Sequence, residues 1–264
     1  MIAARAPHML RVLSLVLLGA PLIAGPPFRT DDPQPVDLGH LELYAFSAGQ
    51  HVPGNSSGVG PAVEFNYGIL VDTQFHLVVP YAYSRSQDAP SQAGFGDTEI
   101  GIKFRFIHET DSRPQVGIFP LLEIPTGNAG KGLGSGHSQV FLPIWIQKGW
   151  GTWTTYGGYG WWRNPGTGNR NWNYAGWLLQ RDFGEQLTLG AEVYHTTAMT
   201  TTGQAAAGFN AGGQVNLSER HHLLFSAGRN LSGDRQSIFY LGYQLTLGTF
   251  ANLGDWFQHG RGHP

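Results

Sequence analysis

The chain contains no cysteine. This absence excludes disulfide-stapled folds, zinc–thiolate sites and cysteine nucleophiles, and it keeps an exported chain free of wrong disulfides. Charge is scarce as well, because Asp, Glu, Lys and Arg make up 13% of the 264 residues, against about 25% in typical soluble domains. The formal net charge of −2 and the lack of any Lys/Arg run argue against a nucleic-acid partner.

Long apolar runs are also missing. The most apolar stretch extends only from Val12 to Ile23 and follows Arg5 and Arg11. A membrane-spanning helix needs about 20 apolar residues, so this stretch predicts a secretory signal peptide, residues 1–24, with cleavage after Ala24. No other stretch approaches that length, which excludes a helical membrane topology.

Glycine and aromatic residues are abundant instead. The chain has 38 Gly and 8 Trp, its aromatic content is 12%, and its hydrophobic content of 41% excludes disorder. High Gly and aromatic content with low charge fits a lipid-facing β-protein with aromatic girdles. The length suits one large all-β domain.

The strand pattern is clearest between Gly96 and Ile107. Here Ile100, Ile102, Phe104 and Phe106 alternate with Glu99, Gly101, Lys103 and Arg105. Side chains of a strand alternate between its faces, so one face is apolar and the other is charged. In a soluble sheet the apolar face would cover a core, whereas in a transmembrane barrel it would meet lipid and the charges would line the lumen.

The whole chain favours the barrel. Twelve strand candidates follow one another at about 40–48, 60–68, 73–84, 96–107, 115–125, 138–148, 153–163, 172–182, 187–196, 207–217, 222–229 and 237–247. Each is close to the roughly 9–11 tilted residues that cross a bilayer. Short connections, such as 70–72 and 149–152, alternate with longer Gly/Ser/Asn-rich ones, such as 49–59 and 126–137.

This alternation predicts an all-β fold, an antiparallel up-and-down transmembrane β-barrel of about twelve strands with short periplasmic turns and longer extracellular loops. The expected organisation is a signal peptide (1–24), a Pro-rich N-terminal extension without regular structure (25–39), the barrel (40–250) and a C-terminal tail (251–264).

Strand parity also predicts which side chains line the lumen. The candidates are Glu64, His76, Glu99, Lys103, Arg105, Phe119, Glu123, Trp145 and Glu192. A Lys or Arg facing lipid near the midplane would cost about 2–4 kcal/mol, so the cationic candidates should point inward. These charges could pair with one another to fill a narrow barrel, or they could form a polar constriction along a solute path.

Two cross-strand arrangements follow from the turns. Closing the turn at 109–114 sets Glu123 opposite either Glu99 or Gly101. The first register brings two carboxylates together, and the second places Glu123 diagonal to Glu99 and Lys103. Across the turn at 70–72, His76 should lie near Asn66 and Glu64.

Several motifs resemble catalytic or binding sites but lack the required context. Residues 54–58 match G-x-S-x-G, yet no strand–turn–helix surrounds them, so a flexible outer loop is expected. Alternate glycines from 130 to 136 have no following helix that could bind phosphate. The pair Asp31–Asp32 is expected to be solvated. His221, His222, His259 and His263 lack carboxylate or cysteine partners at metal-ligand spacing. No metal or cofactor is predicted.

Five segments resemble a known bacterial family. They are PPFRTDDP at 26–33, GDTEIGIKFRF at 96–106, PLLEIPTG at 120–127, TTYGGYGWW at 154–162 and HHLLFSAGR at 221–229. The family is named for the MetA pathway of phenol degradation, and the resemblance extends from about residue 26 to 247. It implies an outer-membrane barrel that admits hydrophobic or aromatic compounds, and it supplies no functional residues.

The resulting prediction is a monomeric, non-enzymatic channel for passive uptake of small solutes, including aromatic or hydrophobic ones, in the bacterial outer membrane. Its expected partners are outer-membrane lipid, the solute and the barrel-assembly machinery. One alternative is a barrel with a plugged lumen that acts as a surface-binding protein, or as a lipid hydrolase using Ser138, His137 and Asn128. Another is a soluble periplasmic β-protein.

Overall fold

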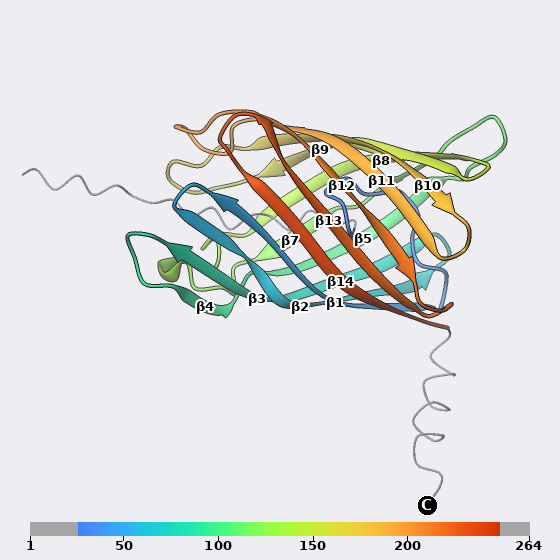
Figure 1. Ribbon diagram of the computed structural model, residues 1–264, viewed down its shortest axis with the longest axis horizontal. Helices are drawn as coiled ribbons and strands as arrows, with labels where there is room; N and C mark the ends of the chain where they lie inside the picture. Colours follow the sequence, from blue (N-terminus) through green and yellow to red (C-terminus); the bar gives the residue numbers. More distant parts are fainter. Residues whose placement is uncertain (1–25, 249–264) are drawn as a thin grey trace, which may run out of the picture.

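The chain forms a closed barrel of antiparallel strands (Figure 1). The structure, a computed structural model, describes residues 26–248. Its strands are β1 (Leu41–Val52), β2 (Asn55–Leu70), β3 (Thr73–Ser86), β4 (Gln92–Phe95), β5 (Thr98–Ile107), β6 (Gln115–Ile118), β7 (Leu121–Ile124), β8 (Gln139–Trp150), β9 (Trp153–Arg163), β10 (Trp172–Phe183), β11 (Leu187–Thr196), β12 (Ala206–Asn216), β13 (His221–Ser232) and β14 (Ser237–Leu247).

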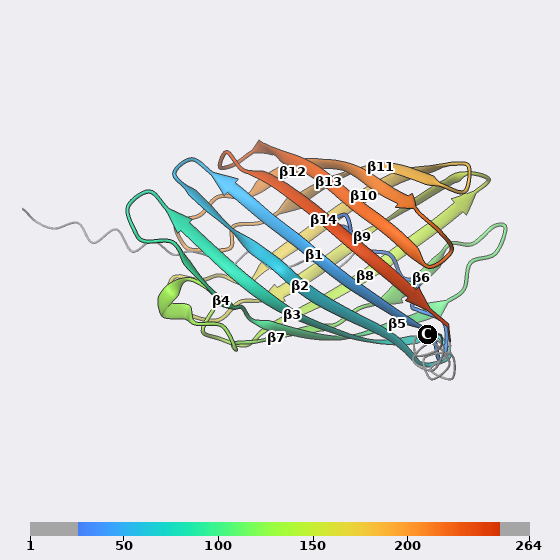
Figure 2. The same ribbon diagram turned by 60° about the horizontal axis from the view of Figure 1, so that its bottom comes forward.

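The first and last strands close the barrel, because β1 pairs with β14 along its length (Figure 2). β4 and β5 share one position in the wall, since both pair with β3, and β6 and β7 share another between β5 and β8. The fourteen strands therefore occupy twelve positions, which confirms the predicted barrel. Among residues 26–248, no helix has the length and apolar character needed to cross a membrane.

The faces of the strands are inverted relative to a soluble protein. On β5, Glu99 and Lys103 are 2% and 6% exposed, whereas Phe104 and Phe106 are 41% and 46% exposed. Other strands also turn large apolar side chains outward, including Val63, Val79, Leu142, Ile144, Val193 and Leu241. Buried charge inside an apolar exterior is the arrangement of a barrel in lipid and does not fit the soluble alternative.

One expected strand is interrupted. Residues 115–125 form β6 and β7 on either side of Phe119 and Pro120. Proline lacks the N–H that a central strand donates to its neighbour, so the ladder breaks there. The Pro120 carbonyl still accepts from Ile102 N at 3.2 Å, and Phe119 is buried inside the barrel.

The first extracellular connection is shorter than expected. The segment 49–59 is almost entirely strand, and only Pro53 and Gly54 join β1 to β2, with Gly54 at φ 85°. The expectation of a flexible loop at 54–58 is therefore wrong. Polar side chains cross-link the two strands there, since Gln50 bonds Ser57 at 3.2 Å and the His51 ring bonds the Ser56 hydroxyl at 2.9 Å.

The glycine-rich loop between β7 and β8 folds into the barrel mouth. It contains the 3-10 turn η1 (Ala129–Lys131), and its Leu133 packs in an apolar cluster with Val59 and Ala82. Asp97 holds the loop by accepting bonds from Gly127 N at 2.9 Å and from Ser135 N at 2.6 Å. This loop is therefore part of the lumen surface.

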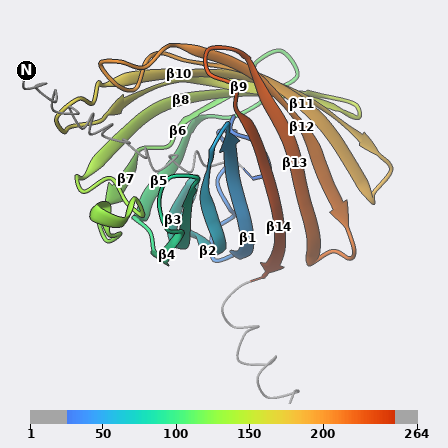
Figure 3. The same cartoon turned by 60° about the vertical axis from the view of Figure 1, so that its left-hand side comes forward.

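The N-terminal extension lies inside the barrel. Residues 26–39 have no helix or strand, as predicted from their proline content, and they lie within the ring of strands (Figure 3). Thr30 and Asp31 are 0% and 2% exposed. The predicted signal peptide (1–24), the last predicted barrel residues 249–250 and the tail (251–264) fall outside the described residues.

Candidate functional site: the barrel lumen

Glu192 on β11 anchors the N-terminal segment. Its Oε1 accepts from Arg29 N at 2.8 Å, and its Oε2 accepts from Thr30 N at 2.7 Å. Asn210 of β12 donates a further bond to Oε1 at 3.1 Å, and the Glu192 side chain is 1% exposed. Hydrogen bonds to a charged acceptor are the stronger kind, so this carboxylate fixes the segment to one wall.

Lys103 on β5 holds the segment from another wall. Its Nζ donates to Asp31 Oδ1 at 3.0 Å, while the side chains of Lys103 and Asp31 are 8% and 2% exposed. The expectation that Asp31 is solvated is therefore wrong, because the inward Lys103 draws this carboxylate into the lumen. Asp32 is more open, with a side chain 33% exposed.

Apolar and aromatic contacts complete the attachment. Phe28 is buried with Tyr156 and Leu178, from β9 and β10. The guanidinium of Arg29 lies 4.5 Å from the ring centre of Tyr194, a cation–π contact. Since its partners lie on well-separated strands, the segment crosses the lumen.

Two cavities adjoin this segment, and Glu64 and His76 of the barrel wall also line both. The outer cavity, toward the β1–β2 turn, has a volume of about 170 Å³ and is mainly apolar; its walls include Phe46, Val59, Val78, Ala82, Leu133 and Tyr240. The inner cavity, toward the periplasmic turns, has a volume of about 560 Å³ and is mainly polar; its walls include Gln74, Gln147, Gln180, Gln214, His222 and Gln244. Pro26, Pro27 and Phe28 line both cavities.

An acidic cluster forms one wall of the outer cavity. His76 Nε2 lies 2.9 Å from Glu99 Oε1, and His76 Nδ1 lies 2.6 Å from Asn66 Oδ1. The Asn66 amide in turn donates to Glu64 at 2.7 Å. Of the two registers left open by the sequence, the structure has the one that sets Glu123 opposite Glu99. Within the described chain, no hydrogen bond or ion pair reaches the Glu123 carboxylate.

Aromatic rings fill the adjoining part of the lumen, along β8, β9 and β10. Phe141 stacks on Trp162 with ring centres 4.7 Å apart, and Trp162 stacks on Trp172 at 5.4 Å. Trp145 meets Phe141 edge-on at 6.3 Å. The sequence did not assign the faces of β9 and β10. The glycine at position 160 was a usable signal for the inward face of β9, because a glycine leaves room for a neighbouring ring. An added Cβ at Gly160 would come within 2.2 Å of the Phe141 ring.

Arg105 lies at the periplasmic end, apart from the acidic cluster. Its Nη2 donates to Asp72 Oδ1 at 2.7 Å, and His108 Nε2 lies 2.8 Å from Asp72 Oδ2. Burial alone would raise the pKa of Asp72, but hydrogen bonds and positive charge from Arg105, with His108, hold it below its usual value. Asp72 thus ties the β2–β3 turn to β5.

The nine lumen candidates therefore fall into four groups. Glu64, His76, Glu99, Glu123 and the nearby Phe119 meet at the acidic wall; Lys103 and Glu192 hold the N-terminal segment; Trp145 belongs to the aromatic stack; Arg105 lies at the rim. Two lumen residues were not predicted: Tyr174, whose hydroxyl lies 2.9 Å from Thr30 Oγ1, and Tyr240 in the outer cavity.

Two of the three residues considered for lipid hydrolysis, Asn128 and His137, make hydrogen bonds within the loop. Asn128 caps η1 by accepting from Lys131 N at 3.1 Å. Ser135 Oγ donates to the carbonyl of His137 at 2.7 Å, and no bond joins the rings or hydroxyls of His137 and Ser138 among the described residues. No group of three His, Cys, Asp or Glu placed to hold a metal occurs in residues 26–248.

A closed barrel with an apolar exterior and a charged, aromatic interior is the architecture of outer-membrane β-barrel proteins. The COG4313 outer membrane channel from Pseudomonas putida F1 superposes with a TM-score of 0.68 at 16% identity, covering 82% of this chain and 98% of that chain. The KdgM porin in complex with disordered oligogalacturonate has a TM-score of 0.54 at 11% identity, with coverages of 77% and 99%. The NanC porin has a TM-score of 0.52 at 7% identity, with coverages of 78% and 100%.

The chain belongs to the family described as Putative MetA-pathway of phenol degradation, whose model matches residues 46–247. This confirms the resemblance found in the sequence. No curated protein matches the chain.

Proposed function

We propose that the protein is a passive outer-membrane channel for small apolar or aromatic solutes, narrowed by its own N-terminal segment. The observation that carries this proposal is the division of the lumen into a small apolar outer cavity and a larger polar inner cavity. Residues 26–37 of the segment are held mainly by side-chain contacts, and only its end pairs with a strand, where Leu38 forms an isolated bridge with Gly68 of β2. The part that crosses the lumen can therefore be displaced while the barrel wall stays intact.

The outer cavity supports the solute class. Its volume of about 170 Å³ is below the roughly 300–1,000 Å³ typical of drug-sized ligand sites, which suits a solute of one ring. Phe46 and Tyr240 stack at 5.2 Å and form an aromatic wall. One fold neighbour is described as a channel and two as porins, which is consistent with this function.

The surface supports residence in the outer membrane. The outward apolar side chains form the lipid contact of each strand, and aromatic residues such as Trp153, Tyr159 and Trp177 add to it. Closure by the chain's own β1–β14 pairing requires no second copy, so a monomer inserted by the barrel-assembly machinery is expected.

Solute flux tests the channel function. Full-length mature protein is reconstituted into liposomes, and uptake is compared across a panel from sugars to benzyl alcohol, with empty liposomes as the control. The proposal expects flux that is greater for single-ring compounds than for sugars. Absence of flux and of conductance in planar bilayers contradicts it and favours the plugged-lumen alternative.

Release of the N-terminal segment tests its role. Glu192→Ala removes the acceptor of Arg29 N and Thr30 N, so we expect a several-fold rise in flux and conductance. Glu192→Gln keeps one acceptor oxygen and should give a smaller rise. Glu109→Gln is the matched control, because Glu109 bonds Lys148 and Gly149 at the periplasmic turns. Equal conductance in all variants would show that the segment does not limit passage.

A further inference from the structure

Three buried polar atoms without partners gather around the outer cavity. Among the described residues, seven buried side-chain polar atoms lack a hydrogen bond, and these include Glu99 Oε2, Asn210 Oδ1 and the Tyr240 hydroxyl. All three residues line the outer cavity. A buried polar group without a partner costs about 1–3 kcal/mol, and native structures keep few of them. Three of the seven atoms thus belong to residues around one cavity, where a bound ligand can supply partners, and the other four lie elsewhere.

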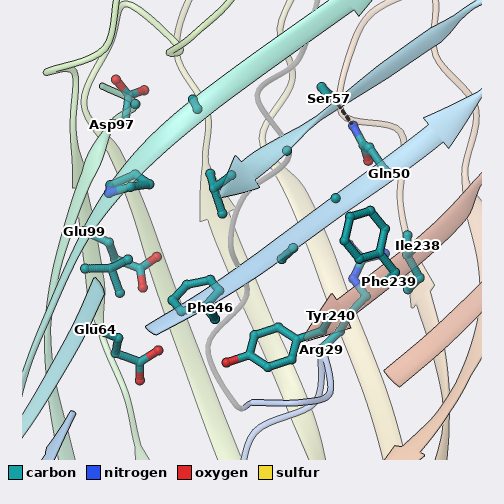
Figure 4. A pocket seen from close by; sticks show the side chains of 18 of the residues that line it. Arg29, Phe46, Gln50, Ser57, Glu64, Asp97, Glu99, Ile238, Phe239 and Tyr240 are labelled. Carbon is teal, nitrogen blue, oxygen red and sulfur yellow. Dashed lines mark hydrogen bonds between the residues drawn. The ribbon is translucent and has the colours of Figure 1, made fainter. Parts of the chain in front are cut away.

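The remaining walls of the cavity are suited to an apolar body. Figure 4 shows the carboxylates of Glu64 and Glu99 on one side, directed toward the rings of Phe46 and Tyr240. The two rings stack with an interplanar angle of 21°, and Leu133 of the inward loop closes the cavity beside them. An apolar ligand can therefore lie on the aromatic pair with its polar end at the acidic wall.

The free atoms define what that polar end must be. Ionised carboxylate oxygens and amide oxygens only accept hydrogen bonds, and a tyrosine hydroxyl can donate or accept. Glu123, opposite Glu99, adds a carboxylate that no described side chain neutralises. Arg29 is the one Lys or Arg among the lining residues, and its guanidinium lies over the Tyr194 ring. The polar end of the ligand should therefore donate a hydrogen bond to the acidic wall, and an anionic ligand should be repelled by it.

We infer that the outer cavity is a binding site for a small apolar solute that carries a hydrogen-bond donor, a hydroxyl or an ammonium group, with the donor at Glu99. This inference rests on the proposed function and narrows its solute class. Aromatic or aliphatic carboxylates of the same size are excluded from the site. Glu99 and Tyr240 are the residues that determine the specificity.

Equilibrium binding to the detergent-solubilised full-length protein tests the inference. Isothermal titration calorimetry compares four probes with one ring each: benzyl alcohol, benzylammonium, toluene and benzoate. We expect benzyl alcohol and benzylammonium to bind at least about tenfold more tightly than toluene, because one hydrogen bond to a charged group contributes that much free energy. Benzoate should bind most weakly of the four. Toluene or benzoate binding as tightly as benzyl alcohol would overturn the inference.

Two variants locate the donor site. Glu99→Gln keeps the side-chain shape and removes the charge, so the preference for benzylammonium over toluene should fall by about tenfold. Tyr240→Phe removes a hydroxyl that has no partner, so the barrel should fold normally; benzyl alcohol should bind several-fold more weakly while toluene is unaffected. Glu109→Gln should change neither preference. Unchanged preferences in both cavity variants would contradict the assignment.

The binding assay does not depend on transport. Discriminating binding without liposome flux would contradict the channel and leave this site intact. Flux without discrimination among the four probes would support the channel and contradict this site.

Discussion

The lumen has two regions, one filled by packed aromatic rings and one lined by acidic side chains. The aromatic region comprises Phe141, Trp145, Trp162 and Trp172 on β8, β9 and β10; these rings pack on one another, and none of them lines the outer or the inner cavity. The acidic region comprises Glu64, His76, Glu99 and Glu123 on β2, β3, β5 and β7, and it borders the outer cavity with polar atoms left unpaired.

This difference suggests that the aromatic region contributes mainly to the stability of the barrel and the acidic region mainly to its function. Stacked rings bury large areas and make specific contacts, so the aromatic region fixes the shape of the lumen. In the acidic region, Glu123 and one oxygen of Glu99 have no hydrogen-bond partner among the described residues, so these groups add little to stability, as is common at functional sites. Substitutions in the first region should therefore change unfolding, and substitutions in the second should change selectivity.

The largest effect is expected in the aromatic stack. Trp162 is 0% exposed and lies between two rings, so Trp162→Ala should lower the free energy of unfolding by about 3–5 kcal/mol. Urea titration in lipid vesicles measures this loss. Trp161→Ala, on the same strand with its ring 37% exposed, is the matched control and should lose less. Equal losses would mean that the stack has no special structural role.

The acidic region depends on its inward loop. Asp97→Ala removes the acceptor of Gly127 N and Ser135 N, and bonds to a charged group contribute about 1.5–3 kcal/mol each. The loop should open, and trypsin should cleave after Lys131 several-fold faster, as followed by mass spectrometry. Asp88→Ala in the neighbouring loop should leave cleavage unchanged. If the Asp97 variant also resists cleavage, packing of Leu133 alone holds the loop.

The acidic wall should also select ions. With Glu64, Glu99 and Glu123 beside one pore and Arg29 as the cation lining the same cavity, wild-type channels should favour cations. The double variant Glu99→Gln/Glu123→Gln should reduce that preference while changing stability little. The reversal potential across a KCl gradient reports it. A reversal potential that stays at the wild-type value would place the selective region elsewhere.

The smallest effect concerns the rim below the acidic region. The pKa of Asp72 is held down in the folded protein, so its ion pair with Arg105 stabilises the barrel above the unfolded-state value of about 4 and is lost as pH falls below that. Asp72→Asn tolerates the positive φ of 58° and should cost about 1 kcal/mol or less at pH 7.

Urea titrations at pH 7 and pH 3 test this. The difference between wild type and variant should shrink at pH 3. A constant difference would show that the charge of Asp72 is not what stabilises the turn.

The strand pattern made the wall of the barrel predictable. Alternation on β5 was sufficient to place Lys103 inside and Phe104 outside, because a charge facing lipid is costly. The predicted positions of the loops were less accurate. The polar segment 49–59 has the composition of a loop, yet most of it pairs as strand. The register of Glu123 stayed open because the turn at 109–114 permits either pairing.

Contacts across the lumen could not be predicted from the sequence. The pair Lys103–Asp31 joins residues 72 positions apart, and no local pattern encodes such a partner. Trp161 and Trp162 are adjacent and face opposite ways, so alternation of apolar and polar residues cannot distinguish their faces. The position of the proline-rich segment follows from these long-range contacts and from no periodicity of its own.

The position of the N-terminal segment has a consequence for the order of assembly. It is synthesised ahead of every strand, yet its anchor Glu192 lies 163 residues after Arg29, and its partner Ser226 lies 199 residues after Pro27. Contacts over such separations form late, because a long loop must close first. The segment is therefore made before every strand of the barrel, yet it can dock only after β11 and β13 have joined the sheet.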